Sequence, residues 1–413
     1  MTTEAWIIDA ARTPRGIGKV DRGSLAHLHP QHLSATVLNA LKERNGIRTE
    51  EVDDVIWGCS TQRGKQGTCI GRMSVLAAGW DTRASGVTLD RFCGSGITSV
   101  NFAAASIMSG MEDLVIAGGV EMMSYTAQLA AEGGSAMLDA GNLRLRDLHP
   151  QPHQGICADV IATLEGITRE NVDRLAYESQ QRAKVAIENG YFAKSVVPVY
   201  NEDGTLALDH DEFPRPQTTL EGLAQLPPVF EAFMQMPVDE TGETFDSIVR
   251  RTYPDIRINH VHHAGNSSGV VDGSGALLLA SPDYARAQGW KPRARVVATA
   301  NAAGSPELML NEPVPAAKKV LAKARMTLND IDLFEVNEAF AVVAYKFMRD
   351  LELDPAKVNV NGGAIALGHP IAATGAILIG TVLDELERRD LTTGLVTMCA
   401  AGGMAPAVII ERI

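Results

Sequence analysis

Short apolar runs rich in β-branched residues alternate along the chain with longer Ala-rich stretches in which apolar residues recur at helical spacing. One series of such runs lies before residue 120, and a second begins near residue 290. The strands that this pattern predicts are 5–9, 52–58, 87–92 and 114–119, then 293–300, 331–336, 358–361 and 395–399. The predicted helices are 33–45, 97–108, 314–324, 339–349 and 372–386. Strands that alternate with helices favour an α/β fold with a largely parallel sheet.

The two series correspond in order, which indicates an internal duplication of about 120 residues. VDDVIWG (52–58) parallels IDLFEVN (331–337), and DLVIAGG (113–119) parallels GLVTMCAAGG (394–403). TLDRFCGSG (88–96) and VNVNGGAIALGHP (358–370) each precede an apolar helix. We therefore predict two copies of one α/β unit, stacked face to face. Functional groups are expected at the carboxyl ends of the duplicated strands, where open α/β sheets collect them.

A stretch of different character separates the two copies. It has Pro and Gly clusters and one amphipathic helix over 172–189, which is typical of an inserted substrate-binding or covering element. The predicted boundaries are 1–122 for the first copy, completed by 271–292, then 123–270 for the insert and 293–413 for the second copy.

Composition and charge exclude several classes of protein. The chain has 413 residues, with 37 basic and 50 acidic side chains, and its net charge of −13 lacks the basic footprint of a nucleic-acid-binding protein. No run of about 18 apolar residues predicts a membrane span, and no signal peptide is evident. The five cysteines are scattered without a CxxC pair, which favours a reducing, cytoplasmic location over a disulfide framework or a zinc site.

Cys93 is the strongest candidate for chemistry. It lies between a predicted strand and a predicted helix, and Gly94, Ser95 and Gly96 follow it. Backbone N–H groups at a helix N-terminus would lower the pKa of this thiol and favour a nucleophile, although most cysteines are simply buried. His369 ends the Gly-rich turn that duplicates the Cys93 turn, so pseudo-symmetry would bring an imidazole toward the thiol. The alternative for His369 is a turn histidine bound to backbone.

Two further side chains stand at strand ends of the second copy. Cys399 precedes the turn Ala-Ala-Gly-Gly at 400–403, whose successive N–H groups could hold an oxyanion. Asn337 ends the preceding strand, where its amide could orient a water or a carbonyl oxygen, or could instead cap the helix that follows.

A histidine cluster is a possible metal pair. His260 and His262 share one face of an extended segment in the pattern HxHH, and His263 follows. No third ligand is close in sequence, so a structural role is the favoured interpretation and no metal site is predicted.

Taken together, these residues resemble the thiolase family, the acyl-CoA C-acyltransferases. The resemblance rests on RFCGSG (91–96), GGVEMMS (118–124), NEAF (337–340), NGGAIALGHP (361–370) and CAAGGM (399–404), and it covers nearly all of the chain except about 231–257. It implies two duplicated βαβαβαββ halves, stacked in five layers (αβαβα), with an inserted loop subdomain. It also implies acyl transfer between a cysteine and coenzyme A (CoA), with CoA as a substrate and no metal or redox cofactor.

The family match implies a role for each candidate. Cys93 would be the nucleophile, His369 the base that generates its thiolate, and Cys399 the acid or base at the α-carbon of acetyl-CoA. His369 with a water held by Asn337 would stabilise the enolate.

The match also implies the surroundings of the reaction. Backbone N–H groups of Cys93 and of the turn at Ala401 and Gly402 would hold the tetrahedral oxyanion. The residues that match contacts to CoA or to the acyl group are His153, Arg215, Phe230, Ala264, Ser268, Met309 and Phe340. CoA thioesters are thus the expected partners, along with further copies of the chain in a homodimer or homotetramer.

Departures from the family pattern favour a degradative 3-ketoacyl-CoA thiolase with its own acyl pocket. Residue 154 is Gln where short-chain biosynthetic members usually have Met, residue 401 is Ala where many have Gly, and 231–257 adds length. The alternatives are an acetoacetyl-CoA-forming biosynthetic thiolase, a β-ketoacyl synthase-type condensing enzyme and a non-catalytic paralogue that binds CoA. Cys399 disfavours the synthase, because that class uses a second His, or His and Asn, where this chain has a second cysteine. A β-oxidation complex is a candidate partner, and fatty acid β-oxidation the expected context.

Overall fold

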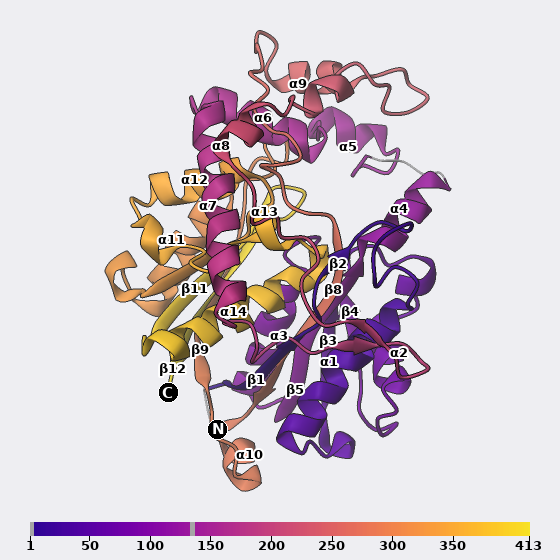
Figure 1. The fold of residues 1–413 in the computed structure, drawn as a ribbon, viewed down its shortest axis with the longest axis vertical. Helices are drawn as coiled ribbons and strands as arrows, with labels where there is room; N and C mark the ends of the chain where they lie inside the picture. Colours follow the sequence, from indigo (N-terminus) through magenta and orange to yellow (C-terminus); the bar gives the residue numbers. More distant parts are fainter. Residues whose placement is uncertain (1–3, 133–136) are drawn as a thin grey trace.

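The computed structural model describes residues 4–132 and 137–413, and one large sheet connects its two halves (Figure 1). The strand order is β10-β11-β12-β9-β1-β8-β5-β3-β4, with β2 paired to β8. The strands are β1 (Trp6–Arg12), β2 (Gly16–Ile17), β3 (Asp54–Gly58), β4 (Val87–Leu89), β5 (Leu114–Met122), β8 (Val271–Ala280), β9 (Ala294–Ala303), β10 (Leu333–Val336), β11 (Thr393–Thr397) and β12 (Met404–Arg412). The apolar pattern did not indicate β8 and β12.

The two ends of the sheet repeat one arrangement of strands. Along β1, β8, β5 and β3 the pairings are antiparallel, antiparallel and parallel. Along β9, β12, β11 and β10 they follow the same sequence. The two sets join where β1 pairs with β9 through Trp6–Arg295 and Ile7–Ala294. The internal duplication is therefore visible in the topology, and the halves are joined edge to edge as well as stacked.

The predicted strand at 358–361 does not form. In the described residues this segment meets β10 through one isolated bridge, between Phe334 and Val358. Asn359 has a φ of +46°, and its side-chain amide accepts from the Val336 N–H at 2.9 Å and donates to the Val336 carbonyl at 2.8 Å. A side chain thus replaces the backbone ladder that β4 forms with β3 in the first copy.

Three layers of helices alternate with the two halves of the sheet, which gives five layers. The helices in these layers are α1 (Pro30–Asn45), α2 (Ile70–Ala77), α3 (Ser95–Ser109), α11 (Pro313–Ala324), α12 (Ala341–Asp350) and α14 (Thr374–Arg389). One apolar cluster joins α1 and α2 to the outer face of the first copy, and another joins α11 and α12 to the outer face of the second. A third cluster holds α3 and α14 between the copies, where Ile56 and Ile410 point inward from their strands. This is the αβαβα arrangement, and it follows from apolar residues on both faces of each strand.

The central helices α3 and α14 approach backbone to backbone at two glycines. A Cβ on Gly96 would lie 2.7 Å from a backbone nitrogen of α14, and one on Gly375 would lie 2.3 Å from a backbone nitrogen of α3. Neither position has room for a side chain, so the first turns of the two helices stay in contact. Because Cys93 precedes α3 and His369 precedes α14, this contact brings the two candidate turns together.

The segment between β5 and β8 holds further helices and a small separate sheet. Its elements are α4 (Met123–Ala131), α5 (Leu143–Leu148), α6 (Gln154–Leu164), α7 (Arg169–Glu188), β6 (Val199–Tyr200), β7 (Leu206–Leu208), α8 (Leu220–Ala224), η3 (Phe230–Phe233) and α9 (Phe245–Thr252). The predicted amphipathic helix is α7, which begins at a capping box of Thr168 and Asn171. It packs against α12 and the short α13 (Ala364–Leu367), as Figure 1 shows. The remaining α-helix, α10 (Pro282–Gln288), follows β8. Among the described residues, no helix is long and apolar enough to cross a membrane.

Candidate active site

Cys93 lies in a tight turn between β4 and α3. Phe92 before it has a φ of +50°, and the Ser95 hydroxyl closes the turn by accepting from the Arg91 N–H at 2.8 Å and donating to the Phe92 carbonyl at 2.7 Å. Pro406 lies behind the turn, because a Cβ on Gly94 would come within 2.8 Å of its ring. The thiol is half-buried and faces an open cavity.

The expectation of a lowered pKa for Cys93 is wrong. Burial raises the pKa of this thiol well above its usual value, and Cys399 and Glu121 raise it further. The physical reason is position: α3 begins at Ser95, so its N–H groups do not outweigh desolvation and the acidic neighbours. Cys93 is therefore a neutral thiol at rest and needs a base when it attacks.

His369 can supply that base. It is buried, and burial followed by the nearby Arg15 guanidinium lowers its pKa to about 3, so the imidazole is neutral. Its Nδ1 lies 2.6 Å from the Thr374 hydroxyl and its Nε2 lies 3.4 Å from the Asn337 amide nitrogen. Since an amide NH₂ can only donate, Nε2 is the acceptor and Nδ1 carries the proton. The lone pair on Nε2 is therefore the one that can accept a proton.

Asn337 does not cap the helix that follows it. The N-cap of α12 is Phe340, three residues later, which leaves the Asn337 amide for other contacts. The residue is 1% exposed, and its Oδ1 finds no hydrogen-bond partner among the described residues. A buried carbonyl oxygen beside an imidazole is suited to hold a water or a substrate group.

Cys399 lies between β11 and β12, at the start of a tight turn. The turn is closed by hydrogen bonds between Ala400 and Met404, and Gly402 in it has a φ of +76°. The thiol is 1% exposed, and burial raises its pKa to about 12. It acts electrostatically on Cys93, so the two thiols lie near each other.

Two cavities meet at Cys93. The serine cavity, of about 490 Å³, is lined by Ser267, Ser268 and His369 among others. The methionine cavity, of about 320 Å³, is lined by Met137 and Met309 among others. The residues that line both are Cys93, His153, Gln154 and Ile371.

The structure brings most of the predicted substrate contacts onto these walls. The serine cavity collects Arg215, Phe230, Ala264, Ser268 and Phe340. The methionine cavity collects Met309 and Ala401. Asn337, Cys399 and Gly402 are not among the lining residues: Asn337 and Cys399 are buried, and Gly402 lies next to Ala401 in its turn.

The loop at 264–269 is fixed directly beside His369. The Ser268 N–H donates to the Ala339 carbonyl at 3.0 Å, and the His369 N–H donates to the Gly269 carbonyl at 2.9 Å. Ser267 in the same loop is a residue that the sequence reasoning missed. Its buried hydroxyl has no partner among the described residues, and it lines the serine cavity.

Phe245 is another lining residue that the sequence reasoning missed. It begins α9 within the extra length 231–257, and its ring meets the His153 ring edge-on at 5.9 Å. The available signal was the capping-box pattern Thr-x-x-Ser that precedes an apolar position in this stretch.

The histidine cluster is tied to carboxylates. His260 and His262 each place Nδ1 2.7 Å from Asp159, and His263 places Nε2 2.7 Å from Asp173. Among the described residues, no group of three or more His, Cys, Asp or Glu side chains could hold a metal ion. The His262 ring meets Phe340 edge-on at 5.7 Å, so this cluster supports a wall of the serine cavity.

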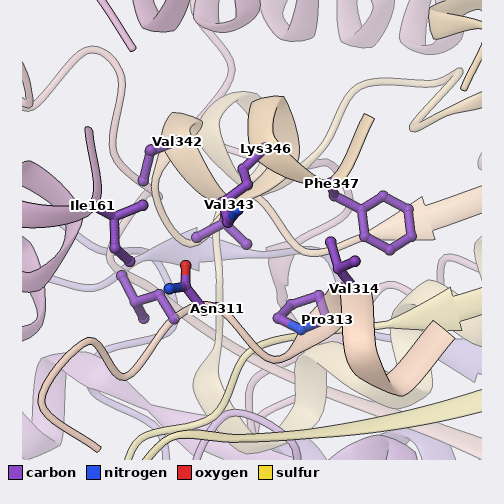
Figure 2. A pocket seen from close by; sticks show the side chains of 9 residues that line it. Ile161, Asn311, Pro313, Val314, Val342, Val343, Lys346 and Phe347 are labelled. Atoms are coloured by element: carbon purple, nitrogen blue, oxygen red, sulfur yellow. The ribbon is translucent and has the colours of Figure 1, made fainter. Parts of the chain in front are cut away.

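A third crevice lies away from the thiols, beneath α12. Figure 2 shows Asn311, Val314, Lys346 and Phe347 around it, and its volume is about 10 Å³. This space holds a water at most, so it is no substrate site.

Comparison with known proteins agrees with this geometry. Residues 5–233 match the thiolase N-terminal domain and residues 290–412 the thiolase C-terminal domain. The chain belongs to the thiolase family. This thiolase is 38% identical to the β-ketoadipyl-CoA thiolase of Acinetobacter baylyi, over 99% of both chains. It is also 38% identical to a steroid 3-ketoacyl-CoA thiolase of Mycobacterium tuberculosis, over 100% of this chain and 95% of that one.

A solved structure gives the same result for the fold. The crystal structure of an acetyl-CoA acetyltransferase from Bacillus anthracis matches this thiolase with a TM-score of 0.84 and 32% identity, over 99% of each chain. The five-layer α/β fold expected from the sequence is confirmed. This thiolase is an acyl-CoA C-acyltransferase, with CoA as a substrate.

Proposed function

We propose that this thiolase works in the degradative direction and cleaves 3-ketoacyl-CoA thioesters with CoA. The Cys93 thiol gives its proton to Nε2 of His369 as Sγ attacks the 3-keto carbon. The C2–C3 bond breaks, its electron pair passes to C2, and Cys399 protonates C2. Acetyl-CoA leaves, and the shortened acyl group stays on Cys93.

The second half of the cycle returns the enzyme to its starting state. The CoA thiol gives its proton to the Cys399 thiolate, and its sulfur attacks the S-acyl carbon. Cys93 leaves and recovers its proton from His369, so protons and electrons balance. The Ala401–Gly402 turn and the backbone N–H of Cys93 are proposed to hold the tetrahedral oxyanion, and Asn337 a water beside the enolate.

One observation carries this proposal: Cys93 lies where the two cavities meet. A thiolase substrate has its reacting carbon between a long CoA arm and an acyl chain, so it needs two binding spaces that open at one nucleophile. Lys19, Arg22 and Arg215 line the serine cavity and could bind the CoA phosphates. The methionine cavity is the proposed place of the acyl chain.

The acyl group is proposed to be neutral. None of the described residues that line the methionine cavity is Lys, Arg, Asp or Glu. Burial lowers the pKa of His153, so this imidazole is no cation either. Two relatives are named for 3-oxoadipyl and β-ketoadipyl thioesters, whose acyl group ends in a carboxylate. An unpaired carboxylate in this cavity would be costly, so we propose a neutral acyl group for this chain.

Trapping of the acyl-enzyme tests the proposal. Incubation with a neutral 3-ketoacyl-CoA without free CoA should add the mass of the shortened acyl group to the peptide that holds Cys93. Cys157→Ala is the matched control, because Cys157 is buried outside both cavities and should leave the adduct unchanged. No adduct, or an adduct on another cysteine, would contradict the mechanism. Thiolysis and condensation rates compared in one buffer distinguish degradative from biosynthetic use.

We also propose that the chain forms a homodimer or homotetramer. In support, β4 ends the described sheet with a neighbour on one side, and Val87 in it is 42% exposed. Light scattering with size-exclusion chromatography tests this, and a monomer at micromolar concentration would contradict it. The cytoplasmic location and a β-oxidation complex partner stay predictions.

A further inference from the structure

The outer wall of the methionine cavity is built from two segments that are far apart in the sequence. Met137 and Leu138 come from the segment before α5, and Phe245 comes from the start of α9. Neither segment belongs to the duplicated sheet units. Met137 and Phe245 belong to one apolar cluster, and their relative position also depends on the polar contacts that hold the two segments to each other.

Arg146 on α5 makes that connection. It is 1% exposed, and its guanidinium binds Asp139 through two hydrogen bonds, at 2.7 and 3.0 Å. The same guanidinium reaches Asp239 at 2.6 Å and Glu243 at 3.1 Å. Arg251 on α9 completes the cluster, because it binds both Glu243 and, at 2.9 Å, Asp147.

The cluster is adjacent to the cavity on both sides. Asp139 directly follows Leu138, and Glu243 lies two residues before Phe245. A planar guanidinium with five donors in fixed directions can hold three carboxylates at one geometry, which an apolar contact could not do. Leu138 and Phe245 thus lie one and two residues from carboxylates that Arg146 binds.

We propose that Arg146 is a positioning residue that sets the acyl-chain preference of this thiolase by fixing the outer wall of the methionine cavity. The proposal rests on the proposed function, which places the acyl chain in that cavity. An acetoacetyl group has one methyl beyond its reacting carbonyl and gains little from a distant wall. A longer neutral chain gains about fourfold in affinity for each methylene that it buries.

The test is a chain-length series on the full-length enzyme. Wild type and Arg146→Met are assayed for thiolysis of 3-ketoacyl-CoA substrates of four, six, eight and ten carbons. We expect Arg146→Met to lower the gain in kcat/KM per methylene from about fourfold to about twofold, while acetoacetyl-CoA changes by less than about twofold. Arg146→Lys should restore part of the gain. An unchanged chain-length gradient in folded Arg146→Met would overturn the proposal.

Arg293→Met is the matched control. Arg293 is 10% exposed and also binds three carboxylates, of Asp9, Asp384 and Glu387, but it lines neither cavity. Its loss should lower thermal stability without changing the chain-length gradient. If both variants flatten the gradient equally, general loosening explains the result and Arg146 has no special role.

A second variant and a binding measurement complete the test. If Arg146→Met does not fold by circular dichroism, the double variant Asp239→Asn, Glu243→Gln keeps the buried Arg146–Asp139 pair and should flatten the gradient more weakly. Calorimetric binding of saturated acyl-CoAs of four to ten carbons to Cys93→Ala protein, with and without Arg146→Met, measures the gradient without turnover. Failed thiolysis with an intact binding gradient would overturn the proposed function alone. A binding gradient equal in both proteins would overturn the role of Arg146.

Discussion

The serine cavity and the methionine cavity open at the same thiol but differ in charge. Lys19, Arg22 and Arg215 line the serine cavity, together with one carboxylate, Glu212, which accepts from the Ile17 N–H at 2.8 Å. The Ser267 hydroxyl in this cavity has no partner among the described residues. The methionine cavity has no charged side chain among its described lining residues. The chain as a whole carries a net charge of −13, so the cations of the serine cavity are a local exception.

This difference can sort the two ends of a substrate. A polyanionic arm is attracted to the cationic side, whereas on the neutral side a charge would lose its hydration without gaining a partner. Binding of the two ends then places the reacting carbon beside Cys93, and no side chain has to contact that carbon to position it. A substitution at a residue shared by both cavities should therefore affect every substrate, whereas a substitution on one wall should affect only the end of the substrate bound there.

The largest effect should come from the shared thiol. Cys93→Ala should lower thiolysis by at least about 10⁴-fold for every chain length, because both half-reactions pass through the S-acyl bond. CoA binding measured by calorimetry should stay within about twofold, since the cationic wall is intact. Activity near the wild-type rate would rule out Cys93 as the nucleophile.

Cys399→Ser should separate the two half-reactions. A serine is a far weaker acid and base at carbon, so cleavage and α-proton exchange of acetyl-CoA in D₂O should fall by about 10³-fold. Cys399 also exchanges a proton with the CoA thiol, but acyl exchange onto Cys93 from an acyl-CoA should fall much less, because a thiolate leaves without the acid that a carbanion needs. Mass spectrometry of the acyl-enzyme and NMR of the exchange measure the two steps, and equal losses in both would contradict the division of roles.

A charged acyl end should be the next largest effect. A 3-ketoacyl-CoA that ends in a carboxylate should react about 10- to 100-fold more slowly in kcat/KM than a neutral one of the same length. The KM for CoA serves as the internal control, because the other cavity is unaffected. A preference for the carboxylate would contradict the assignment of the uncharged methionine cavity to the acyl chain.

Arg215→Met should affect the serine cavity alone. Arg215 is exposed at the cavity mouth, with its guanidinium over the Phe213 ring at 5.6 Å. Loss of an exposed cation should raise the KM for CoA about fivefold and leave the chain-length gradient unchanged. A changed gradient would mean that the two cavities are not independent.

The smallest effect concerns His369, the proposed base for Cys93. The pKa of His369 is lowered to about 3, so the neutral form that the mechanism needs is present at every pH above about 4. Its ring NMR signals, identified by their loss in His369→Ala, should not titrate between pH 8 and pH 5. A midpoint near pH 6.5 would show an ordinary, solvated histidine.

The sequence predicts the site better than it predicts the walls around it. Cys93 and His369 stand in Gly-rich turns that precede α3 and α14, and the close contact of these two helices at Gly96 and Gly375 brings the turns together. The position of Phe245 depends on the ion cluster of Arg146, and no local pattern in 231–257 specifies which distant segment it meets. Similarly, the apolar residues at 358–361 predict a strand, but the amide of Asn359 takes the ladder bonds instead.

The raised pKa of the Cys93 thiol also could not be predicted from its neighbours in the sequence. Its place before a helix is readable from the sequence, but its desolvation and the nearness of Cys399 and Glu121 arise from residues far along the chain. Burial and these two neighbours raise the pKa of the thiol, and the start of the following helix does not reverse this.

The position of β1 in the sheet has a consequence for how the chain folds during its synthesis. Residues 6–12 are synthesised well before their strand partners β8 and β9, which lie at 271–303. At 5–20 residues per second, the first strand waits roughly 15 to 60 s before it can pair. Until then an apolar strand without a sheet is exposed, and chaperone capture or aggregation competes with folding. Slowed translation before residue 280 should therefore lower the yield of active enzyme more than slowed translation near the end of the chain.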